Sequence, residues 1–126
     1  MNSERTDEAK YEQVPADFPR PEEAGSIGGA QPKLLLTEYK GKYYVPGCTP
    51  PELWASWDFC EDLANQLAAK SLESKAGKRA HLSEKEILAQ YLPRLIATKW
   101  TSEPEARWVI RRVAKMLGWP VPEAAF

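Results

Sequence analysis

The sequence lacks any long apolar run. No stretch of its 126 residues approaches the roughly 20 apolar residues that cross a bilayer. The N-terminal segment MNSERTDEAK also has no apolar core of the kind found in signal peptides. From these absences we expect a cytoplasmic protein that does not engage a membrane.

Thiol and imidazole groups are scarce, because the chain has two cysteines and one histidine. These residues alone cannot supply the four ligands of a structural zinc site, and a reducing compartment disfavours a disulfide. We therefore expect no metal and no cofactor. Cys60 is expected to pack as a small apolar residue on a helix face. The alternative, a catalytic pair with His81, has no local support in the sequence.

No charge of one sign dominates, since 17 basic and 18 acidic residues give a net charge of −1. Such a balance argues against a protein that coats nucleic acid. The distribution is uneven, however, because residues 1–25 hold seven acidic and three basic residues. That segment has three prolines and no apolar periodicity, which predicts a flexible, disordered acidic arm. Within it, Phe18 and the neighbouring prolines favour an extended stretch that contacts a partner.

The rest of the chain carries regular patterns. β-forming residues on both sides of Gly41 predict a hairpin over residues 33–46. Three capping signals, each followed by apolar residues at spacings of three and four, predict helices over about 50–74, 84–98 and 103–117. We therefore expect an α+β fold, with one hairpin packed on three helices in a single domain over residues 26–126.

Two further expectations concern the helices. Pro93 lies inside the second predicted helix, and because it lacks a backbone N–H we expect a kink or a break there. All five tryptophans lie in the helical half, where aromatic residues at helical spacing usually pack. Most of them are therefore expected to anchor the core.

The segment from Ser26 to Lys33, SIGGAQPK, is the most unusual stretch. Glycines allow a close approach of the backbone to a ligand, successive N–H groups can bind an anion, and a lysine adds positive charge. The candidate phosphate-binding residues are Ser26, Gly28, Gly29, Gln31 and Lys33. The segment matches neither the P-loop nor the dinucleotide-binding pattern. In the alternative interpretation, the glycines only turn the chain into the hairpin.

The pattern S-I-x-G-A-Q-x-K, followed by a strand, resembles the glycine-rich loop of the HipA family of bacterial toxin kinases. The resemblance covers eight to twenty residues and implies a regulatory, autophosphorylated serine at Ser26 and a loop glycine at Gly29. The family's catalytic and metal-binding aspartates have no counterpart, because Asp58 and Asp62 share one predicted helix. Phosphoryl transfer needs both groups, so we expect no kinase activity. The whole chain is also similar to short proteobacterial proteins to which no biochemical role is attached.

The last predicted helix is basic. Its arginines could neutralise phosphates of a nucleic acid, or they could form a solvated face that favours the negative helix end. No residues form a catalytic constellation. We therefore expect a small, non-enzymatic interaction or regulatory protein, bacterial in origin, that binds a protein partner as a monomer or homodimer. The alternatives are a phosphate- or nucleotide-binding module and a DNA-binding regulator. The candidate partner-binding residues are Phe18, Arg20, Arg107, Arg111 and Arg112.

Overall fold

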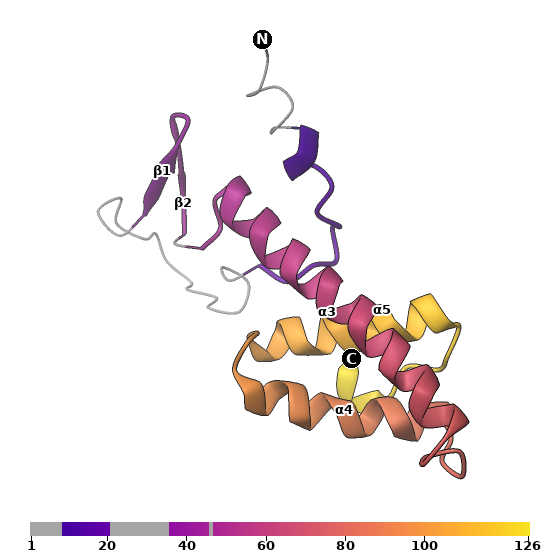
Figure 1. Ribbon diagram of the computed structural model, residues 1–126. Coiled ribbons are helices and arrows are strands. Elements are labelled where there is room, and N and C mark those ends of the chain that lie inside the picture. Colours follow the sequence, from indigo (N-terminus) through magenta and orange to yellow (C-terminus); the bar gives the residue numbers. More distant parts are fainter. Residues whose placement is uncertain (1–8, 21–35, 46) are drawn as a thin grey trace. The chain divides into compact units, whose positions relative to one another are not determined.

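The computed structural model describes residues 9–20, 36–45 and 47–126. Its elements are, in chain order, β1 (Thr37–Tyr39), β2 (Lys42–Tyr44), α3 (Pro50–Ala76), α4 (Glu84–Thr98), α5 (Glu103–Leu117) and the short 3-10 helix η2 (Glu123–Ala125) (Figure 1). A helical turn also covers residues 9–11, inside the expected arm. One antiparallel hairpin and these helices confirm the expected α+β fold.

The contacts group the chain into two compact units. Unit 1 is Met1–Asp58 and unit 2 is Phe59–Phe126, so their boundary falls within α3. The boundary expected at residue 25 lies outside the described residues. The expectation of a single domain over residues 26–126 therefore stays a prediction.

The hairpin of unit 1 is short and has a two-residue turn. Thr37 lies opposite Tyr44, and Tyr39 lies opposite Lys42. Lys40 and Gly41 between the strands both have positive φ, 50° and 82°. A type I′ turn requires positive φ at both central residues, and its twist matches that of the strands. The turn predicted at Gly41 is therefore confirmed. The ends of the predicted hairpin, residues 33–35 and 46, lie outside the described residues.

Helix α3 begins with a reciprocal cap formed by Thr49 and Glu52. The Thr49 hydroxyl lies 2.6 Å from a Glu52 carboxylate oxygen, which also accepts the Thr49 backbone N–H at 3.3 Å. The Glu52 backbone N–H donates to Thr49 Oγ1 at 3.4 Å. These contacts occupy donors that have no partner inside the helix, which is why the chain turns helical at this point.

Helices α4 and α5 begin in the same way, at Ser83 with Glu86 and at Ser102 with Glu105. Both helices occupy the predicted ranges. Hydrogen bonds from Ser83 lower the pKa of the Glu86 carboxyl, so the charged form is favoured by the folded state. The contribution of this cap is present above the ordinary pKa of glutamate and is lost as the pH falls below it.

Pro93 does not break α4, so of the expected kink or break the break is wrong, and the kink stays a prediction. The helix continues from Glu84 to Thr98 with Pro93 inside it. Both Pro93 and Ala89, whose carbonyl the missing N–H would have bonded, are exposed. Water can therefore hydrate that carbonyl, which removes much of the penalty for an unpaired backbone group.

The core of unit 2 lies mainly on α4 and α5. Its large, fully buried apolar side chains include Ile87, Leu88, Val109, Ile110 and Val113. Helix η2 contributes the buried Ala125, whose carbonyl oxygen accepts a hydrogen bond from Arg111 at 2.7 Å. The C-terminal segment is thereby fastened to α5.

The ends of α4 and α5 share one backbone conformation but not one residue type. Gly118 ends α5 with a φ of 69°, a left-handed conformation that glycine adopts freely. Lys99 ends α4 in the same region, with a φ of 61°. A residue with a side chain is disfavoured in this conformation, so contacts elsewhere in the fold must offset the cost at Lys99.

The tryptophans divide between the core and the surface. Trp108 is 2% exposed and anchors the core as expected, whereas Trp100 is 64% exposed and does not. In unit 1, Trp54 and Trp57 meet edge to face at 6.3 Å and are partly buried. Neither of their indole N–H groups finds a hydrogen-bond partner among the described residues.

None of the helices in the described part of the chain combines the length and the apolar character needed to span a membrane.

Candidate functional site

An apolar groove runs between α3 and α4 in unit 2, with a volume of about 310 Å³. Each helix lines it with four residues at positions i, i+3, i+4 and i+7, which form one face over two turns. The side chains that line it are Leu63, Gln66, Leu67, Lys70, Tyr91, Arg94, Leu95, Thr98 and Trp100. We call this surface the α3–α4 groove.

Trp100 is placed beside the groove by the end of α4. After Lys99 turns the backbone out of the helix, the Trp100 N–H donates to Thr98 Oγ1 at 3.1 Å. The Thr98 hydroxyl in turn donates to the Leu95 carbonyl at 2.6 Å. These bonds hold the backbone of Trp100 while its side chain stays largely exposed, so a large aromatic surface is presented next to the groove.

The charge along the groove is positive. Lys70 and Arg94 are both exposed, and neither forms an ion pair or a hydrogen bond with any residue that the structure describes. None of the described residues that line the groove carries a carboxylate. On α3, the Asp62 carboxylate accepts a hydrogen bond from the Gln66 amide at 2.8 Å. The groove therefore offers an apolar floor with two unneutralised cations.

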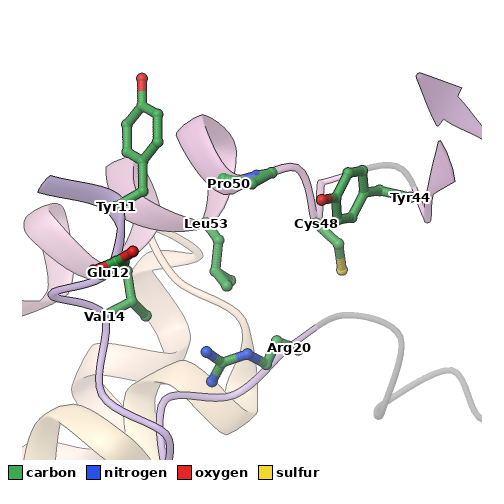
Figure 2. A pocket seen from close by; sticks show the side chains of 8 residues that line it. All are labelled: Tyr11, Glu12, Val14, Arg20, Tyr44, Cys48, Pro50 and Leu53. Atoms are coloured by element: carbon green, nitrogen blue, oxygen red, sulfur yellow. The ribbon is translucent and has the colours of Figure 1, made fainter. Parts of the chain in front are cut away.

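A second hollow, of about 360 Å³, lies within unit 1 (Figure 2). Its lining includes Tyr44, Cys48 and Arg20. The guanidinium group of Arg20 already donates to the carbonyl oxygens of Pro15, Ala16 and Phe18. Because the Arg20 guanidinium group is hydrogen-bonded to the backbone of the preceding turn, it is less available to a ligand than Lys70 and Arg94 in the α3–α4 groove.

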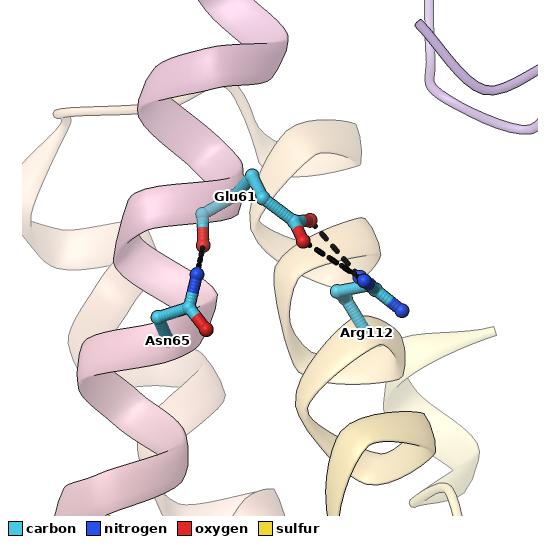
Figure 3. A network of polar contacts seen from close by, with 3 residues as sticks. All are labelled: Glu61, Asn65 and Arg112. Atoms are coloured by element: carbon cyan, nitrogen blue, oxygen red, sulfur yellow. Dashed lines mark hydrogen bonds and ion pairs between the residues drawn. The ribbon is translucent and has the colours of Figure 1, made fainter. Parts of the chain in front are cut away.

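The three arginines of α5 that were predicted to bind a partner form contacts within unit 2. Arg112 on α5 binds Glu61 on α3 through two nitrogens, at 2.9 and 2.8 Å (Figure 3). Arg107 pairs with Glu103 at 2.7 Å, and Arg111 holds the Ala125 carbonyl. A nucleic acid or a protein would have to compete with these contacts, so binding through this face stays a prediction.

The remaining predicted site residues are differently placed. Phe18 is 1% exposed, so its ring is not available on the surface in this structure. Arg20 caps the turn that precedes it, as described above. The candidate phosphate-binding residues Ser26, Gly28, Gly29, Gln31 and Lys33 lie outside the described residues. The resemblance to the kinase loop therefore stays a prediction.

Within the described ranges, no group of three or more histidine, cysteine, aspartate or glutamate side chains could hold a metal ion. Cys60 is 1% exposed, as expected for a packed residue. Burial raises the pKa of its thiol to about 12, and the negative charge of Glu105 adds to the shift. The thiol is therefore protonated at neutral pH and is a poor nucleophile.

Cys60 should accordingly resist alkylation in the folded chain. At pH 8 a pKa of about 12 leaves about one thiol in ten thousand ionised, whereas unfolding restores an ordinary pKa. We expect iodoacetamide to modify Cys60 at least ~100-fold more slowly in buffer than in concentrated urea. Mass spectrometry of the Cys60 peptide over time measures both rates. Equal rates would show that the helix face carrying Cys60 is open to solvent.

Sequence reasoning missed the α3–α4 groove. Leu67, Tyr91 and Leu95 belong to stripes that the periodicity assigns to the core, yet all three line the groove, and Leu67 and Tyr91 remain partly exposed. Comparison with known proteins found no matching family model, no similar curated protein and no similar solved structure.

Proposed function

We propose that this chain is a small, non-enzymatic interaction protein that binds a polypeptide partner through the α3–α4 groove. The observation that carries the proposal is the exposure of Trp100, at 64%, directly beside an apolar groove. Tryptophan, tyrosine and arginine are the residue types that most often dominate the energy of protein interfaces. All three occur in the lining, as Trp100, Tyr91 and Arg94.

The arrangement of the groove supports binding. Leu63, Leu67 and Leu95 form an apolar centre, and Lys70 and Arg94 lie among the polar residues around it. An apolar centre with a polar rim is the usual anatomy of a protein interface.

Substitution of Trp100 tests the proposal. We expect Trp100→Ala to reduce the amount of specific partner captured from a native cell lysate by ~30-fold or more, as expected for the loss of an interface hot spot. Phe126→Ala is the matched control, because Phe126 is also a large exposed aromatic residue, at 76%, and does not line the groove. Quantitative mass spectrometry of the captured proteins gives the ratios.

Circular dichroism should show that both variants remain folded, since neither side chain is buried. The proposal fails if Trp100→Ala captures the same proteins in the same amounts as the unchanged chain. It also fails if Phe126→Ala reduces capture as much, because the loss would then reflect general apolar stickiness.

A further inference from the structure

We infer that the partner segment is an acidic amphipathic helix, which lies in the α3–α4 groove as a third helix. This inference rests on the proposed function and specifies the occupant. Three features of unit 2 carry it: the helical geometry of both walls, the unneutralised positive charge and the position of Trp100.

Both walls are helix faces of equal length. The lining spans residues 63–70 of α3 and 91–98 of α4, which is about 10 Å of helix on each side at 1.5 Å per residue. Side chains at i, i+3, i+4 and i+7 form ridges into which the side chains of another helix can interlock. An extended peptide that adds to a sheet needs a free strand edge, and unit 2 contains no strand. The groove therefore suits a helix of two to three turns.

The positive charge of Lys70 and Arg94 favours a partner segment that carries acidic residues. Ser74 Oγ and Tyr91 OH lie 3.0 Å apart and tie α3 to α4 near the loop that joins them. Lys70 precedes Ser74 by one turn, and Arg94 follows Tyr91 by almost one turn. The chain reverses direction between α3 and α4 (Figure 1), so each cation lies about one turn from the Ser74–Tyr91 contact, on the side away from the loop. Carboxylates of the partner would meet both cations, whereas lysine or arginine there would be repelled.

Trp100 defines the other end of the groove. It follows Thr98, the lining residue of α4 farthest along the chain from Tyr91 and its bond to Ser74. A partner helix would therefore place an apolar side chain against the indole and its carboxylates toward Lys70 and Arg94. This polarity predicts acidic residues clustered about two turns from the apolar anchor.

A display library of 16-residue peptides tests the inference. The library is selected on the full chain and depleted on Trp100→Ala, so that only binders that need the indole remain. We expect apolar residues at i, i+3, i+4 and i+7 in the recovered sequences and at least a fivefold excess of Asp and Glu over Lys and Arg. The best peptide should lose about tenfold in affinity when Lys70→Glu and Arg94→Glu are combined, since each exposed ion pair contributes a few-fold.

Reversing the charge supplies the decisive comparison. A selection on the Lys70→Glu, Arg94→Glu variant should recover basic amphipathic peptides in place of acidic ones. The variant that combines Lys42→Glu with Lys78→Glu is the matched control, because it makes the same change of charge at exposed lysines that do not line the groove. This control should still recover acidic peptides.

The outcomes separate the inference from the proposed function. Recovery of basic, proline-rich or non-periodic peptides, or of no peptide at all, would overturn the inference. Continued Trp100-dependent capture of a lysate protein would then leave the proposed function standing. Self-association of the chain that Trp100→Ala abolishes, measured by sedimentation, would assign the groove to a second copy and likewise overturn the inference.

Discussion

Replacing Trp108 with alanine is expected to lower the free energy of unfolding by about 3–5 kcal/mol. Trp108 is 2% exposed and lies on α5 beside Val109 and Ile110, which are fully buried. Removing its ring from the packed core of unit 2 forfeits the burial of a large apolar surface and leaves a cavity that the neighbours only partly fill. Small domains are stable by roughly 5–15 kcal/mol, so this variant should lose a large share of its stability.

Urea unfolding followed by circular dichroism at 222 nm measures the change, because α4 and α5 supply much of the helical signal. The same substitution at Trp100 is the internal control, since Trp100 is 64% exposed. It should alter the free energy of unfolding by no more than about 0.5 kcal/mol. Similar losses in the two variants would mean that the core of unit 2 is not organised around Trp108.

The pair between Glu61 and Arg112 is expected to give the second large effect. Glu61 on α3 and Arg112 on α5 are 23% and 34% exposed, and the guanidinium group meets both carboxylate oxygens. Planar, two-point pairing fixes geometry better than a single contact, and partial burial limits screening by water. We expect Glu61→Ala to cost about 1–2 kcal/mol, because it leaves a partly buried arginine without this carboxylate.

A double-mutant cycle isolates the interaction itself. Glu61→Ala and Arg112→Ala, alone and combined, should give a coupling energy of about 1 kcal/mol in urea unfolding. The pair between Glu103 and Arg107 is the comparison, because it is more exposed and lies within one helix. Its coupling should be about 0.3–0.5 kcal/mol. A smaller coupling at Glu61 than at Glu103 would contradict the role of Arg112 in joining α5 to α3.

The helices could be predicted because their boundaries are local. Ser83 with Glu86 and Ser102 with Glu105 fix the starts of α4 and α5 through contacts three residues apart, and any sequence reading can find that spacing. The hairpin turn at Gly41 is local in the same sense. Pro93 shows the limit of a local rule, since its cost depends on whether the carbonyl of Ala89 is exposed to water.

The candidate site could not be predicted because it depends on contacts between residues far apart in the sequence. Trp100 and Trp108 are eight residues apart and chemically identical, and only the packing of α4 against α5 decides that one is exposed and the other buried. The partner of Arg112 lies 51 residues earlier in the chain. The basic helix therefore suggested an open charged face, whereas Arg111 and Arg112 bind residues that are distant in the sequence and Arg107 pairs with Glu103 on its own helix. The α3–α4 groove is likewise a property of two helices together.

The contrast between Lys99 and Gly118 bears on how this sequence can vary. A non-glycine residue in the left-handed conformation costs roughly 1–2 kcal/mol, and Lys99 holds that conformation immediately before Trp100. The tertiary structure must supply the difference. A descendant with glycine at position 99 would recover part of this folding free energy. The recovered stability would offset the loss from a smaller side chain elsewhere in the core of unit 2, so substitution at this helix end widens the range of core sequences that still fold.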